Sequence, residues 1–328
     1  MKQNSGPRIA LVGECMIQLQ QLADGNIHKT YAGDTFNTAT YLARLACIHG
    51  AEVHYLTALG TDQFSNDMLA TWRQENIHCD HVRRISNKLP GLYYVHIDDQ
   101  GERTFSYWRD NSAAKELFKD TTTPSLSSLA EYDCIYVSGI SFAILDEYSR
   151  ERLLGLLIEA RSSGSIICFD NNYRAKLWPD LATTQAWYRR ILDTTDIAFL
   201  TFDDEQAIWQ DPTPSATIVR YADTSIAELV IKCGAEPCIV KTADFSGQIA
   251  ADTINPDKII DTNAAGDSFS AGYLCGRLSN TQNSELNATI GHKVAGTVIQ
   301  NHGAVIERNA LKDTVAAIQK LVQQPINN

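Results

Sequence analysis

The chain has 328 residues, of which 44% are hydrophobic and 20% charged, and this composition excludes a mainly disordered or collagen-like chain. Its 39 acidic residues outnumber its 28 basic ones, and the net charge of −11 argues against binding to nucleic acid or an anionic membrane, since both require a basic face. No apolar run approaches the roughly 18–20 residues of a membrane span. The first apolar run, Ile9–Ile17, contains Glu14 and predicts a buried strand rather than a signal peptide. We therefore expect a cytoplasmic protein.

Short apolar runs alternate with helical patterns along most of the chain. The runs predict strands at Ile9–Gly13, Val53–Leu59, Cys134–Ser138, Ile166–Asp170, Ile197–Leu200, Leu229–Lys232 and Cys238–Lys241. The patterns between them predict helices at Thr35–Cys47, Phe64–Glu75, Tyr148–Ser162 and Thr183–Leu192, with Asp62 as the N-cap of the second. This alternation predicts an α/β fold with a mostly parallel sheet and helices on both faces.

Two segments, Ile17–Tyr31 and Leu92–Arg109, instead alternate polar and apolar residues. The second contains two such runs around Asp99-Gln100-Gly101, which is typical of a β-hairpin. We expect a single α/β domain over residues 1–328, with a small antiparallel lid from about 16–33 and 89–111. The lid should cover the carboxyl ends of the main strands, where open α/β sheets bind ligands.

The cysteines and histidines show no metal-binding spacing. None of the eight cysteines forms a CxxC pair, and no histidine lies in an HxH or HExxH pattern. Most of the cysteines are therefore expected to be buried, reduced thiols, and the histidines to have surface or core roles.

The most informative segment is residues 261–272, DTNAAGDSFSAG. Its small residues lead directly into a helical pattern, so backbone N–H groups and the positive end of a helix can face an anion. Asp267 then lies in the first helical turn, where a carboxylate can act on a nearby hydroxyl. By spacing alone, a plain turn with a first-turn acid explains the segment equally well.

This segment resembles the Asp-Thr-x-Gly-Ala-Gly-Asp motif of the ribokinase-like (PfkB) carbohydrate kinases, with Ala264 in place of the first glycine. A second family motif, a paired-glycine loop that opens a helix with an Asn, is matched by residues 32–37, AGDTFN, with Asp34 in place of the second glycine. The resemblance extends from about Ile9 to Ile306, nearly the whole chain, and implies a ribokinase-like fold and ATP as phosphoryl donor.

Finer features resemble the branch of this family that phosphorylates 2-keto-3-deoxygluconate. They are GECM at 13–16, LPGLYY at 89–94, GERTFSYWR at 101–109, SGI at 138–140 and FDNNYR at 169–174. A keto acid carries a carboxylate, which favours an Arg in fork geometry. Arg109 ends a predicted lid strand and Arg174 follows a core strand, although a single Arg in such a place is more commonly a surface ion-pair partner.

The resemblance implies roles for individual residues. The catalytic set is Asp267 as general base, with Ala264, Ala265 and Gly266 as an anion hole. The substrate set is Gly33, Asp34, Asn37, Tyr93, Tyr107, Arg109, Ile140 and Arg174. The ATP set is Asn172, Arg174, Lys232, Gly234 and Gly266. Tyr93 and Tyr107 would serve equally as core aromatics.

Glu205 is the residue that the resemblance implies for magnesium, as an indirect partner of Mg²⁺ through water. The segment TFDDE at 201–205 aligns with the family's Asn-x-x-Glu, but Phe202 stands where Asn is usual. A carboxylate at the start of a helix explains Glu205 equally well.

We therefore expect ATP-dependent phosphorylation of 2-keto-3-deoxygluconate to its 6-phosphate. The alternatives are a related fructokinase- or ribokinase-type enzyme and a non-catalytic sugar-acid binding protein. An NAD-dependent oxidoreductase would require Gly-x-Gly-x-x-Gly after the first strand, where this chain has Gly13-Glu14-Cys15-Met16. The expected partners are a small sugar acid and ATP, with no nucleic acid and no membrane, and the sequence leaves open whether the chain forms a homo-oligomer.

Overall fold

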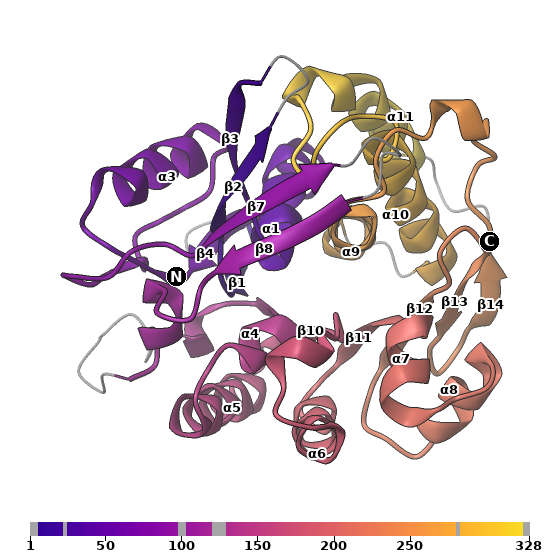
Figure 1. Ribbon diagram of the computed structural model, residues 1–328. Coiled ribbons are helices and arrows are strands. Elements are labelled where there is room, and N and C mark those ends of the chain that lie inside the picture. The colour runs from indigo at the N-terminus through magenta and orange to yellow at the C-terminus, as the bar shows by residue number, and fades with distance from the viewer. Residues whose placement is uncertain (1–5, 22–24, 98–102, 120–128, 280–282, 324–328) are drawn as a thin grey trace.

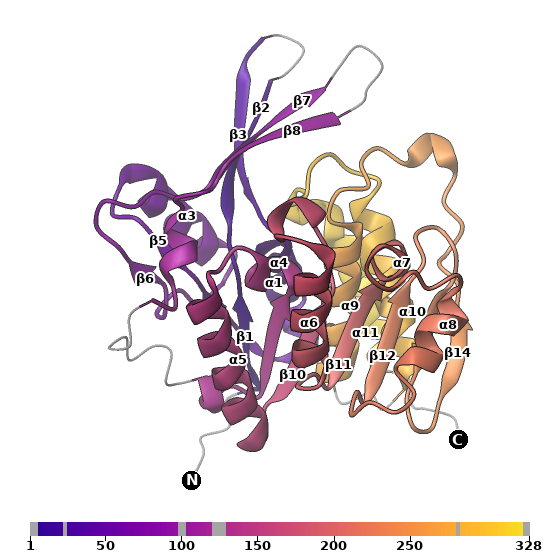
Figure 2. The ribbon, with the colours of Figure 1, turned by 60° about the horizontal axis from the view of Figure 1, so that its bottom comes forward.

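The computed structural model describes residues 6–21, 25–97, 103–119, 129–279 and 283–323. An eight-stranded sheet forms its centre, in the order β14-β13-β12-β11-β10-β9-β1-β4 (Figures 1 and 2). Its strands are β1 (Arg8–Val12), β4 (Glu52–Leu56), β9 (Cys134–Ser138), β10 (Ile166–Asp170), β11 (Ile197–Thr201), β12 (Glu228–Lys232), β13 (Cys238–Lys241) and β14 (Ser246–Ile249). The six strands from β4 to β12 pair in parallel, and β13 and β14 are antiparallel additions, which confirms the mostly parallel sheet.

Helices cover both faces of this sheet, as expected for strands that are apolar on both sides. One face packs against α1 (Asp34–Arg44), α2 (Ala46–His49), α3 (Gln63–Gln74), α9 (Ala265–Leu278), α10 (Ser284–Val298) and α11 (Lys312–Gln323). The other packs against α4 (Gly139–Ala143), α5 (Glu147–Ser162), α6 (Leu181–Leu192), α7 (Phe202–Trp209) and α8 (Pro214–Arg220). Short 3-10 helices lie at Ala113–Glu116, Leu129–Glu131, Ala175–Leu177, Pro256–Lys258 and Arg308–Leu311.

A second sheet of four strands, the lid, stands at one side of the main sheet, and Figure 2 shows its strands rising above the helices. Its order is β3-β2-β7-β8, from β2 (Met16–Gln21), β3 (Ile27–Ala32), β7 (Leu92–Ile97) and β8 (Arg103–Trp108). The chain enters it directly from the carboxyl end of β1, which places the lid at the predicted edge. Strands β7 and β8, like β2 and β3, pair antiparallel as expected, but β2 and β7 pair in parallel, so the prediction of a wholly antiparallel lid is wrong. The predicted turn Asp99-Gln100-Gly101 lies outside the described residues.

Two predicted elements are divided in the structure. The strand expected over Val53–Leu59 breaks after Leu56, because β5 (Ala58–Leu59) leaves the main sheet to pair with β6 (Arg83–Arg84). The helix expected over Thr35–Cys47 divides into α1 and α2. Asp62 caps α3 as predicted, its Oδ1 accepting from the Ser65 N–H at 3.1 Å.

Six of the eight cysteines are buried, and all eight are free thiols, as expected. In the part of the chain that the structure describes, no helix combines the length and the apolar character that a membrane crossing requires.

Candidate active site

A buried ion pair lies where the central strands end. The Lys232 ammonium, at the end of β12, donates to Asp170 Oδ2, at the end of β10, over 2.6 Å. The same carboxylate oxygen accepts from Tyr136 OH at 3.0 Å and from Ser270 Oγ at 3.1 Å. These bonds fix Lys232 in one orientation at the edge of the sheet where the predicted site residues gather.

The turn before α9 is shaped by Asp261. Its Oδ1 accepts from the Asn263 N–H at 2.9 Å and its Oδ2 from the Gly303 N–H at 2.8 Å. Ala264 then adopts a left-handed conformation, with φ 59° and ψ 16°. This is the position where the family motif has glycine, and for an L-residue the left-handed region costs about 1–2 kcal/mol. The turn therefore keeps the shape expected of the motif despite the change to alanine.

The start of α9 presents unpaired backbone donors. No side chain caps this end of the helix, and the Ala265 N–H donates to the Thr262 carbonyl over 3.3 Å. The N–H groups of Gly266 and Asp267 have no acceptor within the helix, as in any first turn. A Cβ atom built on Gly266 would lie 3.4 Å from Lys232 Nζ, so a cation and the helix N-terminus face the same space. Backbone donors and a cation arranged in this way can hold an anion.

Asp267 lies beside this space and is held by the start of α1. Its Oδ2 accepts from Asn37 Nδ2 over 2.8 Å, while Asn37 Oδ1 faces the Gly33 N–H at 3.4 Å. Burial and the neighbouring Asp34 carboxylate raise the pKa of Asp267 to about 7, against the opposing effects of Asn37 and Lys232. A carboxyl with this pKa is suited to taking a proton near neutral pH.

Asp34, the first residue of α1, is held by a side chain from the segment that follows β10. Its Oδ2 accepts from Asn172 Nδ2 over 2.9 Å, and burial raises the pKa of its carboxyl. Asn172 has a positive φ of 27°, and its N–H donates to Asn171 Oδ1 at 2.8 Å. Both Asn residues therefore serve to position Asp34.

Glu205 is fully buried, and both of its oxygens are bonded to protein groups. Oε1 accepts from Asn171 Nδ2 over 2.9 Å, and Oε2 accepts from Arg220 at 2.5 Å and from Tyr221 OH at 3.0 Å. The water-mediated contact between Glu205 and Mg²⁺ stays a prediction. In the folded chain Glu205 orients Asn171, which in turn orients Asn172.

The lid contributes an aromatic face. Tyr93 and Tyr107 are register partners on β7 and β8, with ring centroids 5.7 Å apart, and Phe105 lies 6.3 Å from each of them. Tyr93 is buried and packs in one cluster with Ala264, whereas Tyr107 is 54% exposed. The face of the lid that carries Tyr93 thus packs against the turn before α9.

Arg109 follows β8 and is 9% exposed. The Nη2 atom of Arg109 forms an ion pair with Oε2 of the buried Glu14, so this half of the guanidinium fork already contacts a carboxylate of the chain itself, while Nε has no hydrogen-bond partner among the described residues. A substrate carboxylate would bind Nε and compete with Glu14 for Nη2. Arg174, by contrast, is exposed and donates to the Tyr173 carbonyl at 2.7 Å, while its charge lowers the pKa of Asp34.

The remaining predicted residues lie at the periphery of this group. Ile140 is in α4, directly after the strand that ends at Ser138, and Gly234 is exposed in the turn between β12 and β13 with φ 63°. Sequence reasoning missed Asp170 and Glu14 as members of the site, although both lie inside motifs quoted for the resemblance. It also missed Asp204, whose pKa burial raises to about 6.

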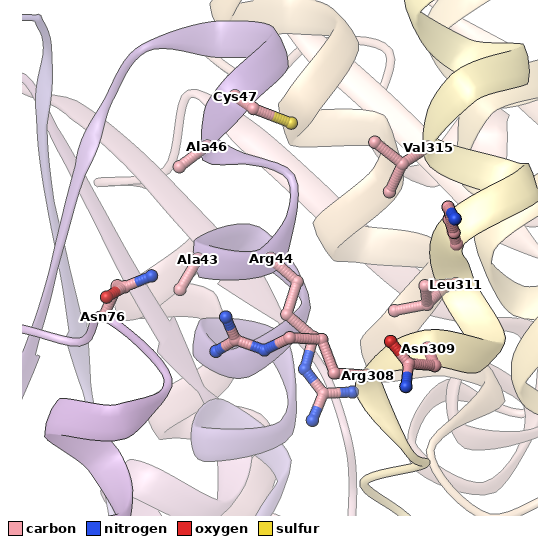
Figure 3. A pocket seen from close by; sticks show the side chains of 10 residues that line it. Ala43, Arg44, Ala46, Cys47, Asn76, Arg308, Asn309, Leu311 and Val315 are labelled. Atoms are coloured by element: carbon pink, nitrogen blue, oxygen red, sulfur yellow. The ribbon is translucent and has the colours of Figure 1, made fainter.

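A separate cavity of about 400 Å³ lies between α2 and α11 and contains none of the predicted site residues (Figure 3). Its guanidinium groups, Arg44 and Arg308, both pair with Glu75, at 2.8 Å each, and Lys312 also lines the cavity. Three cations against one carboxylate leave a net positive charge, but none of the candidate active-site residues lines this cavity.

Comparison with known proteins shows the family of the chain. Residues 7–310 match the model of the pfkB family of carbohydrate kinases. The chain is 45% identical to a 2-dehydro-3-deoxygluconokinase of Escherichia coli K12, in a match that covers 93% of this chain and 98% of that one. It is 44% identical to the enzyme of the same name from Dickeya dadantii, in a match that covers 92% of this chain and 98% of that one. The fold is similar to that of a Xylella fastidiosa fructokinase solved with bound ATP, with a TM-score of 0.79, 22% identity, and coverage of 95% of this chain and 98% of that one.

Proposed function

The chain belongs to the pfkB family of carbohydrate kinases, and on this premise we propose that it transfers the γ-phosphoryl group of ATP to the terminal hydroxyl of 2-keto-3-deoxygluconate, also called 2-dehydro-3-deoxygluconate. The observation that carries the substrate is the 44–45% identity, over nearly the whole length of both chains, to enzymes named for that reaction. Arg109, whose buried Nε has no hydrogen-bond partner in the described part of the chain, supports a substrate with a carboxylate.

Each group in the site then has a chemical task. Asp267 accepts the proton of the sugar hydroxyl as the oxygen attacks the γ-phosphorus. The N–H groups of Gly266 and Asp267, with Lys232, stabilise the negative charge on the transferring phosphoryl group, as an oxyanion hole does. Asn37 orients the base, because its side-chain amide donates to the oxygen opposite the one that reacts.

Asp170 and Asp204 fit a divalent cation by their chemistry. They offer carboxylate oxygens, the ligand type that Mg²⁺ prefers, and the Asp170 charge raises the pKa of Asp204 and of Asp267. Because Lys232 pairs with Asp170 Oδ2, a cation would bind Asp170 through its other carboxylate oxygen. We propose that these two residues hold Mg²⁺, which when bound neutralises phosphate charge.

A panel of acceptors tests this function. Initial rates with ATP are measured for 2-keto-3-deoxygluconate, gluconate, fructose and ribose. We expect the keto acid to have the highest kcat/KM. A higher value for fructose or ribose would establish the sibling sugar-kinase alternative, and no turnover of any acceptor, with binding of the keto acid retained, would establish a sugar-acid binding protein.

The pH dependence of the reaction should report Asp267. Below its pKa the carboxyl is protonated and accepts no proton, so kcat/KM should fall tenfold per pH unit below a midpoint near 7 rather than near 4. Because the Asp34 charge raises this pKa, Asp34→Asn should move the midpoint to lower pH, whatever its effect on the maximal rate. A profile that stays flat down to pH 5 would contradict the assignment of the base.

The lid should close over the sugar, since closure excludes water from the phosphoryl group. Hydrogen exchange in β7 and β8 is expected to slow when the keto acid binds. Strand β14, at the far edge of the main sheet, serves as an internal control whose exchange should not change. If the hydrogen-exchange rates of β7 and β8 are the same with and without the sugar, closure of the lid is not part of the mechanism.

A further inference from the structure

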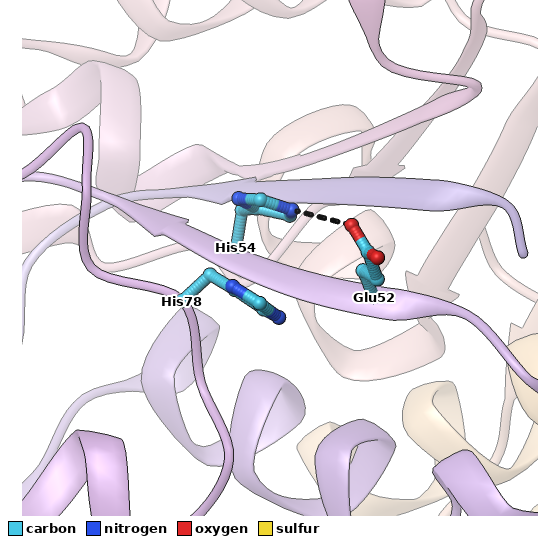
Figure 4. A group of neighbouring side chains, drawn as sticks. All are labelled: Glu52, His54 and His78. Atoms are coloured by element: carbon cyan, nitrogen blue, oxygen red, sulfur yellow. Dashed lines mark ion pairs between the residues drawn. The ribbon is translucent and has the colours of Figure 1, made fainter. Parts of the chain in front are cut away.

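A second group of ligand-type side chains lies on β4, the edge strand of the main sheet, remote from the carboxyl ends where the active-site residues gather. Glu52 and His54 are two residues apart on this strand, so their side chains leave the same face. The segment after α3 runs beside them: the His78 N–H donates to the Val53 carbonyl at 2.8 Å and the Tyr55 N–H to the His78 carbonyl at 3.0 Å. This pairing brings His78 next to His54 (Figure 4).

His54 is the fixed member of this group. Its side chain is 7% exposed, and its ring stacks on that of His78, with centroids 4.5 Å apart, and contacts the edge of Tyr132 at 5.2 Å. Neither ring nitrogen has a hydrogen-bond partner, and Nε2 lies 3.6 Å from Glu52 Oε2. A buried polar group left unsatisfied costs about 1–3 kcal/mol, and a ligand on His54 would remove that cost.

We propose that Glu52, His54 and His78 bind a divalent transition-metal ion of the Zn²⁺ type. Each offers one ligand atom, and the three atoms lie within 4.8 Å of one another. Two imidazole nitrogens and a carboxylate oxygen are a common zinc donor set, with water in the fourth position. The side chains of Glu52 and His78 are 43% and 44% exposed, so they are free to rotate toward the ion while His54 stays in place.

The charges around the group are mixed. Arg8 is the register partner of Glu52 on β1 and opposes a cation, but it pairs with Glu131 at 3.6 Å and lies over the Tyr132 ring. Asp80 lies 3.9 Å from His78 Nδ1 and adds negative charge. The ion would fasten the segment after α3 to the edge strand and stabilise the folded chain, because the unfolded chain does not hold the three ligands together.

Zinc binding to the full chain tests this assignment. The protein is stripped with a chelator and titrated with Zn²⁺ by calorimetry in the presence of excess Mg²⁺, which occupies the carboxylates of the active site. We expect one equivalent to bind and the melting temperature to rise. His78→Ala and Glu52→Gln change half-exposed side chains and should fold normally, and each should weaken binding by about tenfold or more. His28→Ala, at an exposed histidine on β3, is the matched control and should bind as the unaltered chain does.

Two results would overturn the proposal. One is the absence of zinc binding at micromolar concentrations. The other is binding that persists unchanged in both His78→Ala and Glu52→Gln, which would place the ion elsewhere, for example on the exposed thiol of Cys47. Turnover of the keto acid with Mg²⁺ and ATP should be the same in both variants as in the unaltered chain, which separates this test from that of the kinase function.

Discussion

Asp267→Asn should lower kcat by about 10²–10⁴, the usual contribution of a general base. The substitution preserves the size of the side chain and leaves a group that can form a hydrogen bond with Asn37. It removes the carboxylate of Asp267, which is the only acidic residue in the first turn of α9, a helix that lies within the described residues. ATP binding should survive, since the proposed phosphate contacts come from backbone N–H groups and Lys232. Turnover is measured at saturating concentrations of both substrates.

Stability provides the control for this variant. Because folding raises the pKa of Asp267, the folded state disfavours its charged form, and stability is lost as pH rises from the unfolded pKa toward about 7. Asp267→Asn should therefore melt at a higher temperature than the unaltered chain at pH 8, and the difference should shrink at pH 5. A variant that turns over at a near-normal rate would disprove the base assignment, whatever its stability.

Arg109→Ala should raise KM for 2-keto-3-deoxygluconate by roughly 10- to 150-fold. A hydrogen bond to a charged group contributes about 1.5–3 kcal/mol, and each 1.4 kcal/mol changes affinity tenfold. Nε is buried without a hydrogen-bond partner from the residues that the structure describes and Nη2 pairs with Glu14, so a substrate carboxylate would bind Nε and compete with Glu14 for Nη2. Fructose has no carboxylate, and the ratio of kcat/KM for the acid over fructose should fall accordingly.

The ion pair with Glu14 makes a second variant necessary. Removal of Arg109 alone leaves Glu14 buried without its counter-charge, and that repulsion would also weaken the binding of an acid. In the double variant Arg109→Ala with Glu14→Gln the uncompensated charge is absent. A KM that stays high in the double variant supports recognition of the carboxylate by Arg109, whereas a KM restored to normal would assign the loss to Glu14 instead. Arg174→Ala is a less specific comparison, because Arg174 also acts on Asp34.

The resemblance placed the central residues of the candidate site because they lie in short, contiguous motifs. The turn at 261–267 is local, and its residues needed only the helix that follows them to form an anion site. The partners of these residues are not local. Asn37 and Asp267 are 230 positions apart, and Lys232 and Asp170 are 62 apart, so only the folded sheet shows that they bond.

Glu205 shows the limit of motif reasoning most clearly. Its position after a strand, at the start of a helix, is the same in the sequence and in the structure. What the sequence does not contain is the packing that buries Glu205, in which Arg220 and Tyr221 donate to Oε2 and Asn171 donates to Oε1. His54 and His78 are a similar case, since their spacing of 24 residues matches no metal motif and only the bridge beside β4 joins them.

The sequence by itself determined the parallel α/β architecture, the two lid segments and the turn that begins α9, because apolar periodicity and small-residue turns act over a few neighbouring residues. The tertiary structure alone decided which strand ends meet, that burial beside Asp34 brings the pKa of Asp267 to about 7, and that Glu14 lies against Arg109. These properties depend on desolvation and on charges from distant parts of the chain, and both arise only when the strands assemble into one sheet.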